Sequence, residues 1–182
     1  MNAHSERDDA RARTPLGELL GDDGIRFVRI LNAPVERVWK ALVSPEGLRE
    51  WLGEATVDAR LGGAFEIRWD ETDAMHGHIL EFEPPTRLVI AWHETSDGEP
   101  RRNATAPDDR SHLSFTLEPF RDGTRLTLIH RLLRRENLAG IGGGWHSHLD
   151  ALATALQKGT LDIEQRYALV LPDYEALITA AS

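Results

Sequence analysis

The chain contains no cysteine among its 182 residues. This absence excludes disulfides, thiolate nucleophiles and cysteine-ligated zinc sites together, and it fits a reducing compartment, so we expect a cytoplasmic protein. Basic residues are also scarce, because 21 Lys and Arg stand against 30 Asp and Glu and the net charge is −9. Nucleic acids and anionic membranes bind clustered positive charge, so neither is expected as a partner.

Long apolar runs and familiar catalytic motifs are missing too. No stretch approaches the roughly 20 apolar residues of a membrane span, and residues 1–13 are polar rather than signal-like. The sequence has no nucleophile elbow and no HExxH motif, and the glycine run at 142–144 lacks the Lys-Ser/Thr pair of a phosphate loop. No cofactor and no metal site are therefore expected.

What remains has the composition of one globular domain. Hydrophobic residues make up 41% of the chain and charged residues 28%, and the length is sufficient to bury a core. Residues 1–24 are mostly charged and small, which predicts a flexible tail. Periodic apolar patterns fill 25–159, and 160–182 form an extension in which Pro172 is expected to begin a short helix.

Two short helices are predicted after a first strand at 25–31. Apolar residues recur at helical spacing over 34–42, directly after Asn32-Ala33. Ser44 is a typical N-cap before Pro45, and it predicts a second helix that ends at Gly53.

The apolar period then changes from 3.6 to 2. Alternation of apolar and polar residues predicts an antiparallel sheet with one buried face. The predicted strands lie at 55–59, 64–69, 76–83, 87–94, 111–118 and 124–130. The polar segment 95–110 is expected to be a long mobile loop.

The longest helix is expected after the glycine run of Gly140–Gly144. Its apolar residues share one face, which would cover the sheet, and Gly159 is expected to end it. The glycines are expected to act as a hinge that lets the helix tilt and admit a ligand. An α+β domain follows, with a curled sheet packed on this helix. The residues of the apolar stripe are Trp145, Leu149, Leu152, Ala153 and Leu156.

Six segments in this order make the chain resemble the START-like (SRPBCC) superfamily, in the branch of the heat-shock-protein-90 ATPase activator. The resemblance implies a helix-grip fold, also known from birch-pollen allergens. In this fold a curved sheet of about seven strands surrounds a long C-terminal helix, and two short helices follow the first strand. The segments that carry the resemblance are Ala33–Trp39, Trp51–Gly53, Leu61–Phe65, Glu81–Val89, Gly123–Leu128 and Gly144–Leu149.

The resemblance also implies a pocket between the long helix and the sheet. Apolar residues and a few histidines of the inward faces would line it, although the same residues could simply fill the core. The candidates are Trp51, Phe65, Ile67, Trp69, His78, Leu80, Leu88, Ile90, Trp92, Phe115, His130, Trp145, His146 and Leu149.

The histidines are the main polar candidates. His76 and His78 project to one face of a strand, but spacing places no third metal ligand, so a surface pair is favoured over a metal site. His146 and His148 flank the apolar stripe of the long helix on opposite edges. His130 ends an inward-facing strand at a position that is often histidine in the family, and a structural hydrogen bond is favoured there over catalysis.

Three classes of function stay open. The favoured class is a binding protein for a small hydrophobic or aromatic molecule, which predicts an open pocket. A polyketide cyclase-like or hydrolase-like enzyme would need polar groups that converge inside that pocket, and no such constellation is evident from spacing. A co-chaperone-like interaction domain predicts a filled interior and an exposed apolar patch. Edge strands and the segment 161–178 offer surfaces for a homodimer.

Overall fold

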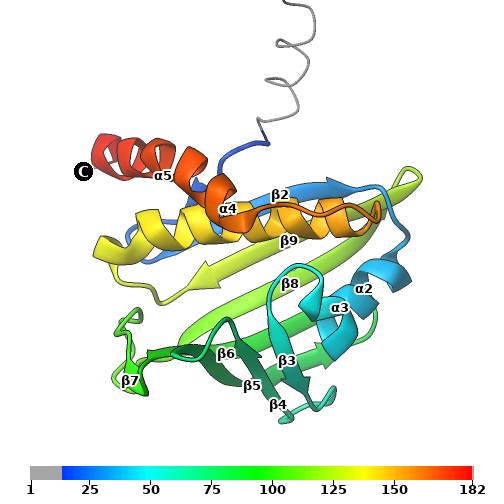
Figure 1. The fold of residues 1–182 in the computed structure, drawn as a ribbon, viewed down its shortest axis with the longest axis horizontal. Coiled ribbons are helices and arrows are strands. Elements are labelled where there is room, and N and C mark those ends of the chain that lie inside the picture. The colour runs from blue at the N-terminus through cyan, green and yellow to red at the C-terminus, as the bar shows by residue number, and fades with distance from the viewer. Residues whose placement is uncertain (1–13, 182) are drawn as a thin grey trace, which may run out of the picture.

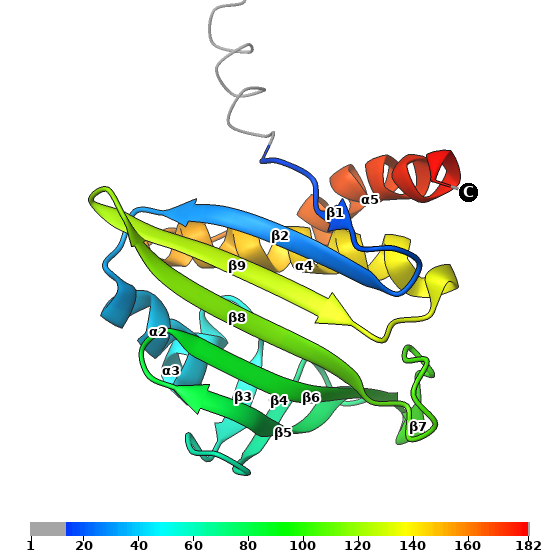
Figure 2. The same cartoon turned by 180° about the vertical axis from the view of Figure 1, so that it is seen from behind.

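The computed structural model describes residues 14–181, which form one curved sheet and four α-helices. All strand pairs are antiparallel, and the sheet order is β1-β2-β9-β8-β6-β5-β4-β3, with β7 paired to β6. Figures 1 and 2 show the strands from the two sides, with α4 lying across the hollow of the sheet. The strands are β1 (Glu18–Leu19), β2 (Gly24–Leu31), β3 (Glu54–Val57), β4 (Ala64–Arg68), β5 (Asp73–Glu83), β6 (Arg87–Ser96), β7 (Glu99–Pro100), β8 (Ser111–Phe120) and β9 (Gly123–Arg131).

The helices occupy three places around this sheet. Helices α2 (Val35–Val43) and α3 (Pro45–Arg49) close one end, and α5 (Ile163–Ala180) lies on the side of α4 that faces away from the sheet (Figure 1). The 3-10 turn η1 (Arg135–Asn137) leads into α4 (Leu138–Ala155). The helix-grip arrangement predicted above is thereby confirmed, including the two short helices that follow a strand.

Alternation along the strands explains which face is buried. In β8 the side chains are buried alternately from Ser111 to Leu117, and buried residues of β8 and β9 pair across the ladder, as Phe115 does with Leu128. The N-cap at Ser44 also forms as expected, because its hydroxyl accepts a hydrogen bond of 3.1 Å from the backbone N–H of Gly47.

The glycine run before Trp145 is not a hinge. It lies inside α4, which begins at Leu138. A Cβ on Gly142 would lie 2.6 Å from the ring of Tyr174, and one on Gly143 would lie 3.0 Å from the ring of Tyr167. The glycines therefore let α5 approach α4 closely, and the idea that they gate a ligand by bending loses its basis.

The end of α4 differs from the expectation as well. The helix ends at Ala155, and the residue in the left-handed conformation is Lys158, with φ of 58°, rather than Gly159.

The segments on either side of the predicted domain pack against it. Of the expected N-terminal tail, residues 1–13 lie outside the described residues, whereas 14–23 contain β1 and contact α4 and α5. Helix α5 begins at Ile163 after an Asp162 N-cap, so Pro172 lies inside it instead of beginning a short helix.

The segment 95–110 is shorter as a loop than expected. Strand β6 continues to Ser96, β7 pairs with it, and Ala104 forms a bridge with Leu133. Among residues 14–181, no helix combines the length and the apolar character that a bilayer span requires.

Candidate ligand pocket

A pocket of about 450 Å³ opens between α4, η1 and the sheet. Its floor comes from the end of β4 and from β5 and β6, and its walls come from α4, α5 and the segment after β7. On α4 it borders Ile141 and also Gly140 and Gly144, where the absence of a side chain leaves space. The volume falls in the range of small-molecule sites, about 300–1,000 Å³.

Three tryptophans line the pocket side by side. The ring centroids of Trp69 and Trp92 are 6.2 Å apart, and those of Trp92 and Trp145 are 5.2 Å apart. The indole N–H of Trp92 is bound by Glu94 and that of Trp145 by His130. The indole nitrogen of Trp69 is buried and has no hydrogen-bond partner among the described residues. A buried N–H donor without an acceptor is costly, so this group is suited to an acceptor on a bound molecule.

Glu94 is the carboxyl group on the pocket floor. Its Oε1 accepts a hydrogen bond of 2.7 Å from Nε1 of Trp92, and its Oε2 accepts one of 2.8 Å from Nδ2 of Asn103. Burial raises the pKa of Glu94, against the opposing effects of the Trp92 hydrogen bond and the Arg101 charge. The sequence signal for Glu94 was its position two residues after Trp92 on one strand, which puts both on the inward face.

Arg101 and Asp73 form an ion pair at the same end of the pocket. Hydrogen bonds from Ser96 and Arg101 lower the pKa of Asp73, and the hydrogen bond to Asp73 raises the pKa of Arg101. The pair is therefore charged on both sides at neutral pH. Sequence analysis missed Arg101 and Asn103 because both lie in the segment that was expected to be a mobile loop.

His130 lies behind the tryptophans and is fully enclosed. Its Nδ1 accepts a hydrogen bond of 2.9 Å from Nε1 of Trp145, so the proton lies on Nε2, which is 2.7 Å from Oγ of Ser111. The Ser111 hydroxyl in turn donates to the carbonyl of Trp92. Desolvation, together with the nearby His112, lowers the pKa of His130 to about 3. His130 therefore donates to the serine rather than accepting its proton, which is the reverse of what a nucleophile–base pair requires.

Three of the fourteen residues expected in the pocket line it, namely Trp69, Trp92 and Trp145. Most of the others are buried away from it and fill the core, which was the alternative interpretation. The indole of Trp51, for example, donates to the backbone carbonyl of Ala41. The core-filling residues are Trp51, Phe65, Ile67, Leu88, Ile90, Phe115 and Leu149.

His78 and Leu80, which were expected in the pocket, are not among the residues that line it. The register between β5 and β6 shifts between Ile79 and Glu81, so the side-chain alternation changes at this point. His78 pairs with Ala91 on the outer face, whereas Ile79 pairs with Ile90 on the inner face. Leu80 has no partner in the ladder register and is half-buried.

His146 also lies outside the pocket. It points to the α5 side of α4, where its Nδ1 is 2.9 Å from the hydroxyl of Tyr174 and its Nε2 is 2.6 Å from that of Thr14. The neighbouring His148 lines the pocket instead, and its Nδ1 donates to the carbonyl of Trp51 at 2.8 Å. Burial lowers the pKa of His148, so it is neutral at physiological pH. Within residues 14–181, no group of three or more His, Asp or Glu is arranged to hold a metal ion.

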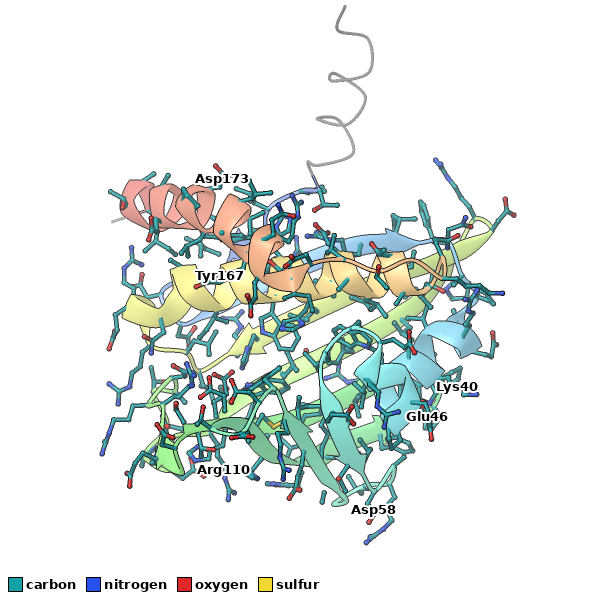
Figure 3. All side chains as sticks on the ribbon, viewed as in Figure 1. Lys40, Glu46, Asp58, Arg110, Tyr167 and Asp173 are labelled. Carbon is teal, nitrogen blue, oxygen red and sulfur yellow. The ribbon has the colours of Figure 1, made fainter. Side chains whose placement is uncertain are left out.

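Helix α5 contributes the ring of Tyr167 to the pocket wall. Figure 3 shows Tyr167 where α5 meets α4, and Asp173 on the opposite side of α5. The rim is completed by Leu52, Glu136 and Asn137.

The sequence and the fold identify the family. The sequence pattern of the family described as "Activator of Hsp90 ATPase homolog 1-like protein" matches residues 32–157. The chain belongs to this family. As a member of the AHSA1-like family it has the SRPBCC fold, in agreement with the resemblance inferred from its sequence. Residues 14–31 and α5 lie outside the matched region.

Solved structures of similar fold include three that illustrate the range of this AHSA1-like domain. CalU16 from Micromonospora echinospora is 29% identical, with 85% of this chain and 88% of that chain covered and a TM-score of 0.66. The protein encoded by gene BPP1335 from Bordetella parapertussis is 27% identical, with coverages of 87% and 88% and a TM-score of 0.67. DynU16, described as a putative protein in the dynemicin biosynthetic locus, is 23% identical, with coverages of 76% and 49% and a TM-score of 0.65, and this likeness concerns the fold alone. A comparison with curated proteins gives no match.

Proposed function

We propose that this protein binds a small, largely aromatic molecule in the pocket between α4 and the sheet. The observation that carries the proposal is a pocket of about 450 Å³ lined by three neighbouring indoles, and one of them, that of Trp69, has a buried N–H without a partner among the described residues. A ligand with a hydrogen-bond acceptor would satisfy this donor while its apolar surface covers the tryptophans.

Native mass spectrometry of the protein purified from its own cells tests the proposal for the natural ligand. A second test titrates the protein with 2-naphthylmethanol, an aromatic alcohol that offers an acceptor to Trp69. Trp69→Phe keeps an aromatic ring and removes the N–H, and we expect it to weaken binding about three- to tenfold, the usual effect of one hydrogen bond.

Gly144 provides a blocking variant with a matched control. A Cβ at Gly144 has no atom within 4 Å, and the residue borders the pocket. Gly144→Leu should therefore fill part of the pocket and abolish binding, whereas Gly144→Ala should retain most of it. Equal affinities in the leucine variant and the parent, together with no co-purifying molecule, would refute the proposal.

A cyclase- or hydrolase-like enzyme acting in the same pocket is the second candidate. One observation favours it, the carboxyl group of Glu94, whose pKa burial raises toward the range of a general acid or base. For this candidate, Glu94→Gln should abolish turnover of a substrate that the variant still binds. The open pocket argues for these two candidates over a co-chaperone-like interaction domain, which predicted a filled interior.

A homodimer and a cytoplasmic location stay predictions. Light scattering on the purified chain tests the first, and cell fractionation tests the second.

A further inference from the structure

We infer that the pocket selects aromatic molecules that carry a positive charge, such as arylalkylamines, over neutral and anionic aromatics. The inference rests on the proposed function and specifies the class of ligand.

The charged groups around the pocket are unbalanced. Three carboxyl groups line it, those of Asp73, Glu94 and Glu136, against one guanidinium, that of Arg101. Arg101 is paired with Asp73, and its charge also acts on Glu94, so three carboxyl groups share a single cation in the pocket lining. His148 is neutral and adds no positive charge. The net charge of −9 on the whole chain also attracts cations rather than anions at long range.

The hydrogen bonds of Glu94 leave room for a cation. Its two oxygens accept from two neutral donors, Trp92 and Asn103, and each carboxylate oxygen has a second lone-pair site. Burial disfavours the charged form of Glu94, and a bound cation would counteract that effect. An ammonium group brings only donors and would form a charge-assisted hydrogen bond with the ionised carboxylate. An anionic ligand would meet Glu94 directly and would have to compete with Asp73 for Arg101.

The tryptophans of the pocket wall also favour a positively charged ligand. Trp69, Trp92 and Trp145 form a continuous group of indoles beside Glu94. Indole is the aromatic side chain that attracts cations most strongly, with an effect that grows when the cation is removed from water. Carboxylate and indole groups in one pocket thus recognise an amine attached to an aromatic ring.

The test measures the affinity of the full chain for three probes that share a naphthalene ring and differ in charge. The probes are 2-naphthylmethylamine, 2-naphthylmethanol and 2-naphthoate, titrated by calorimetry at pH 7.5 and low salt. We expect the amine to bind at least about tenfold more tightly than the alcohol and the carboxylate to bind most weakly. Equal binding of amine and alcohol, or tightest binding of the carboxylate, would overturn the inference and leave the proposed function standing. Failure of all three probes to bind would refute the proposed function itself.

Two variants, Glu94→Gln and Glu175→Gln, test whether Glu94 causes the preference for the amine. Glu94→Gln keeps the size of the side chain and removes the charge, and we expect it to weaken amine binding about tenfold while alcohol binding changes less than about twofold. Glu175→Gln, on the exposed side of α5, removes the same charge away from the pocket and serves as the control. An equal effect of both substitutions on amine affinity would show that only the overall charge matters and would overturn the role of Glu94. Circular dichroism verifies the fold of each variant, and the three-probe comparison on the parent protein does not depend on them.

Discussion

Glu94 is a carboxyl group held by two neutral N–H donors in a largely enclosed place. Because burial raises its pKa, its ionisation at neutral pH opposes folding. Stability from this group is fully present below the pKa of the unfolded chain and is lost as the pH rises through the folded-state pKa. The pocket thus holds a carboxyl group whose charged form the fold disfavours, and such perturbed groups are typical of functional sites.

Glu94→Gln should therefore stabilise the empty protein at neutral pH. Its side-chain oxygen still accepts from Trp92, and the amide of Asn103 can turn to present its oxygen to the new NH₂ group. We expect the melting temperature to rise by a few degrees at pH 7.5 and the gain to disappear near pH 4. Thermal unfolding of both proteins across this range measures it. A gain in melting temperature that is the same at pH 7.5 and pH 4 would show that ionisation of Glu94 does not destabilise the protein.

His130 has the opposite effect on the pH dependence of stability. Its pKa is lowered from 6.5 to about 3, so the folded protein keeps it neutral where the unfolded chain binds a proton. Stability from this group is present above about pH 6.5 and is lost as the pH falls toward 3, at up to about 1.4 kcal/mol per pH unit.

His130→Gln should weaken this acid sensitivity. Glutamine can accept from Trp145 and donate to Ser111, but it fits the site less rigidly, so we expect a loss of about 1–3 kcal/mol at pH 7.5 and a shallower decline between pH 6.5 and 4. Urea unfolding at a series of pH values measures both effects. His76→Gln, at an exposed position of β5, should keep the decline of the parent protein. If the free energy of unfolding declined with pH equally in His130→Gln and the parent, His130 would not be the cause of the acid sensitivity.

At the scale of elements, the packing of α5 on α4 depends on Gly142 and Gly143, which face the rings of Tyr174 and Tyr167. Gly142 has no room for a methyl group, since its Cβ would lie within 2.6–3.1 Å of three atoms of the Tyr174 ring. Gly144, two residues further along the same helix, has nothing within 4 Å. A comparison of substitutions at Gly142 and Gly144 therefore separates the effect of helix propensity from that of interhelical packing.

Gly142→Ala should destabilise the protein and Gly144→Ala should not. Alanine favours a helix by up to about 1 kcal/mol over glycine, so Gly144→Ala is expected to be neutral or stabilising. At Gly142 the overlap with Tyr174 should outweigh that gain and leave a net loss of about 1–3 kcal/mol. Chemical denaturation measures both values. Similar stabilities for the two variants would mean that α5 can shift away at little cost.

The elements could be predicted where a local pattern determines them. Alternation gave the long strands, and Ser44-Pro45 gave the start of α3, because both signals are local. The bulge at Leu80 was not visible, since Ile79 and Leu80 are both apolar and either can face inward. The role of Gly142 depends on Tyr174, more than 30 residues away, and no pattern within the helix reveals it.

The candidate site was harder to predict than the fold for the same reason. The alternation along β6 predicted that Trp92 faces inward. The same alternation puts Glu94 on that face, but the sequence analysis did not select Glu94 because it looked only for apolar residues and histidines there. Arg101, Asn103 and Tyr167 reach the pocket through the long-range placement of the segment after β7 and of α5.

At the scale of the whole molecule, segments outside the family match are joined to α4 by a buried polar network. Asp150 of α4 accepts hydrogen bonds from Thr14 at 2.9 Å and from Nε of Arg166 on α5 at 2.8 Å. Burial opposes its ionisation, but hydrogen bonds from His146, Thr14 and Arg166 outweigh this and lower its pKa. We propose that residues 14–23 and α5 are integral to the fold rather than a tail and an extension.

The hydroxyl of Tyr174 connects all three parts of this network. It accepts a hydrogen bond of 2.8 Å from the backbone N–H of Gly17 and lies 2.9 Å from Nδ1 of His146. The ring is fully buried, and burial raises the pKa of the hydroxyl to about 12, so it stays protonated. Removing this oxygen leaves a buried N–H of Gly17 without a partner, which is more costly than the loss of one exposed hydrogen bond.

Tyr174→Phe is therefore expected to lower the free energy of unfolding by about 1–3 kcal/mol and to increase hydrogen exchange at the Gly17 amide. The matched control is Tyr167→Phe, because the Tyr167 hydroxyl forms no hydrogen bond within residues 14–181 and its loss should change stability by less than about 0.5 kcal/mol. Urea unfolding gives the energies, and exchange followed by mass spectrometry reports on the segment 14–23. If exchange in this segment were as fast in the parent as in Tyr174→Phe, residues 14–23 would not be held by α5, and they would be the tail that the sequence alone predicts.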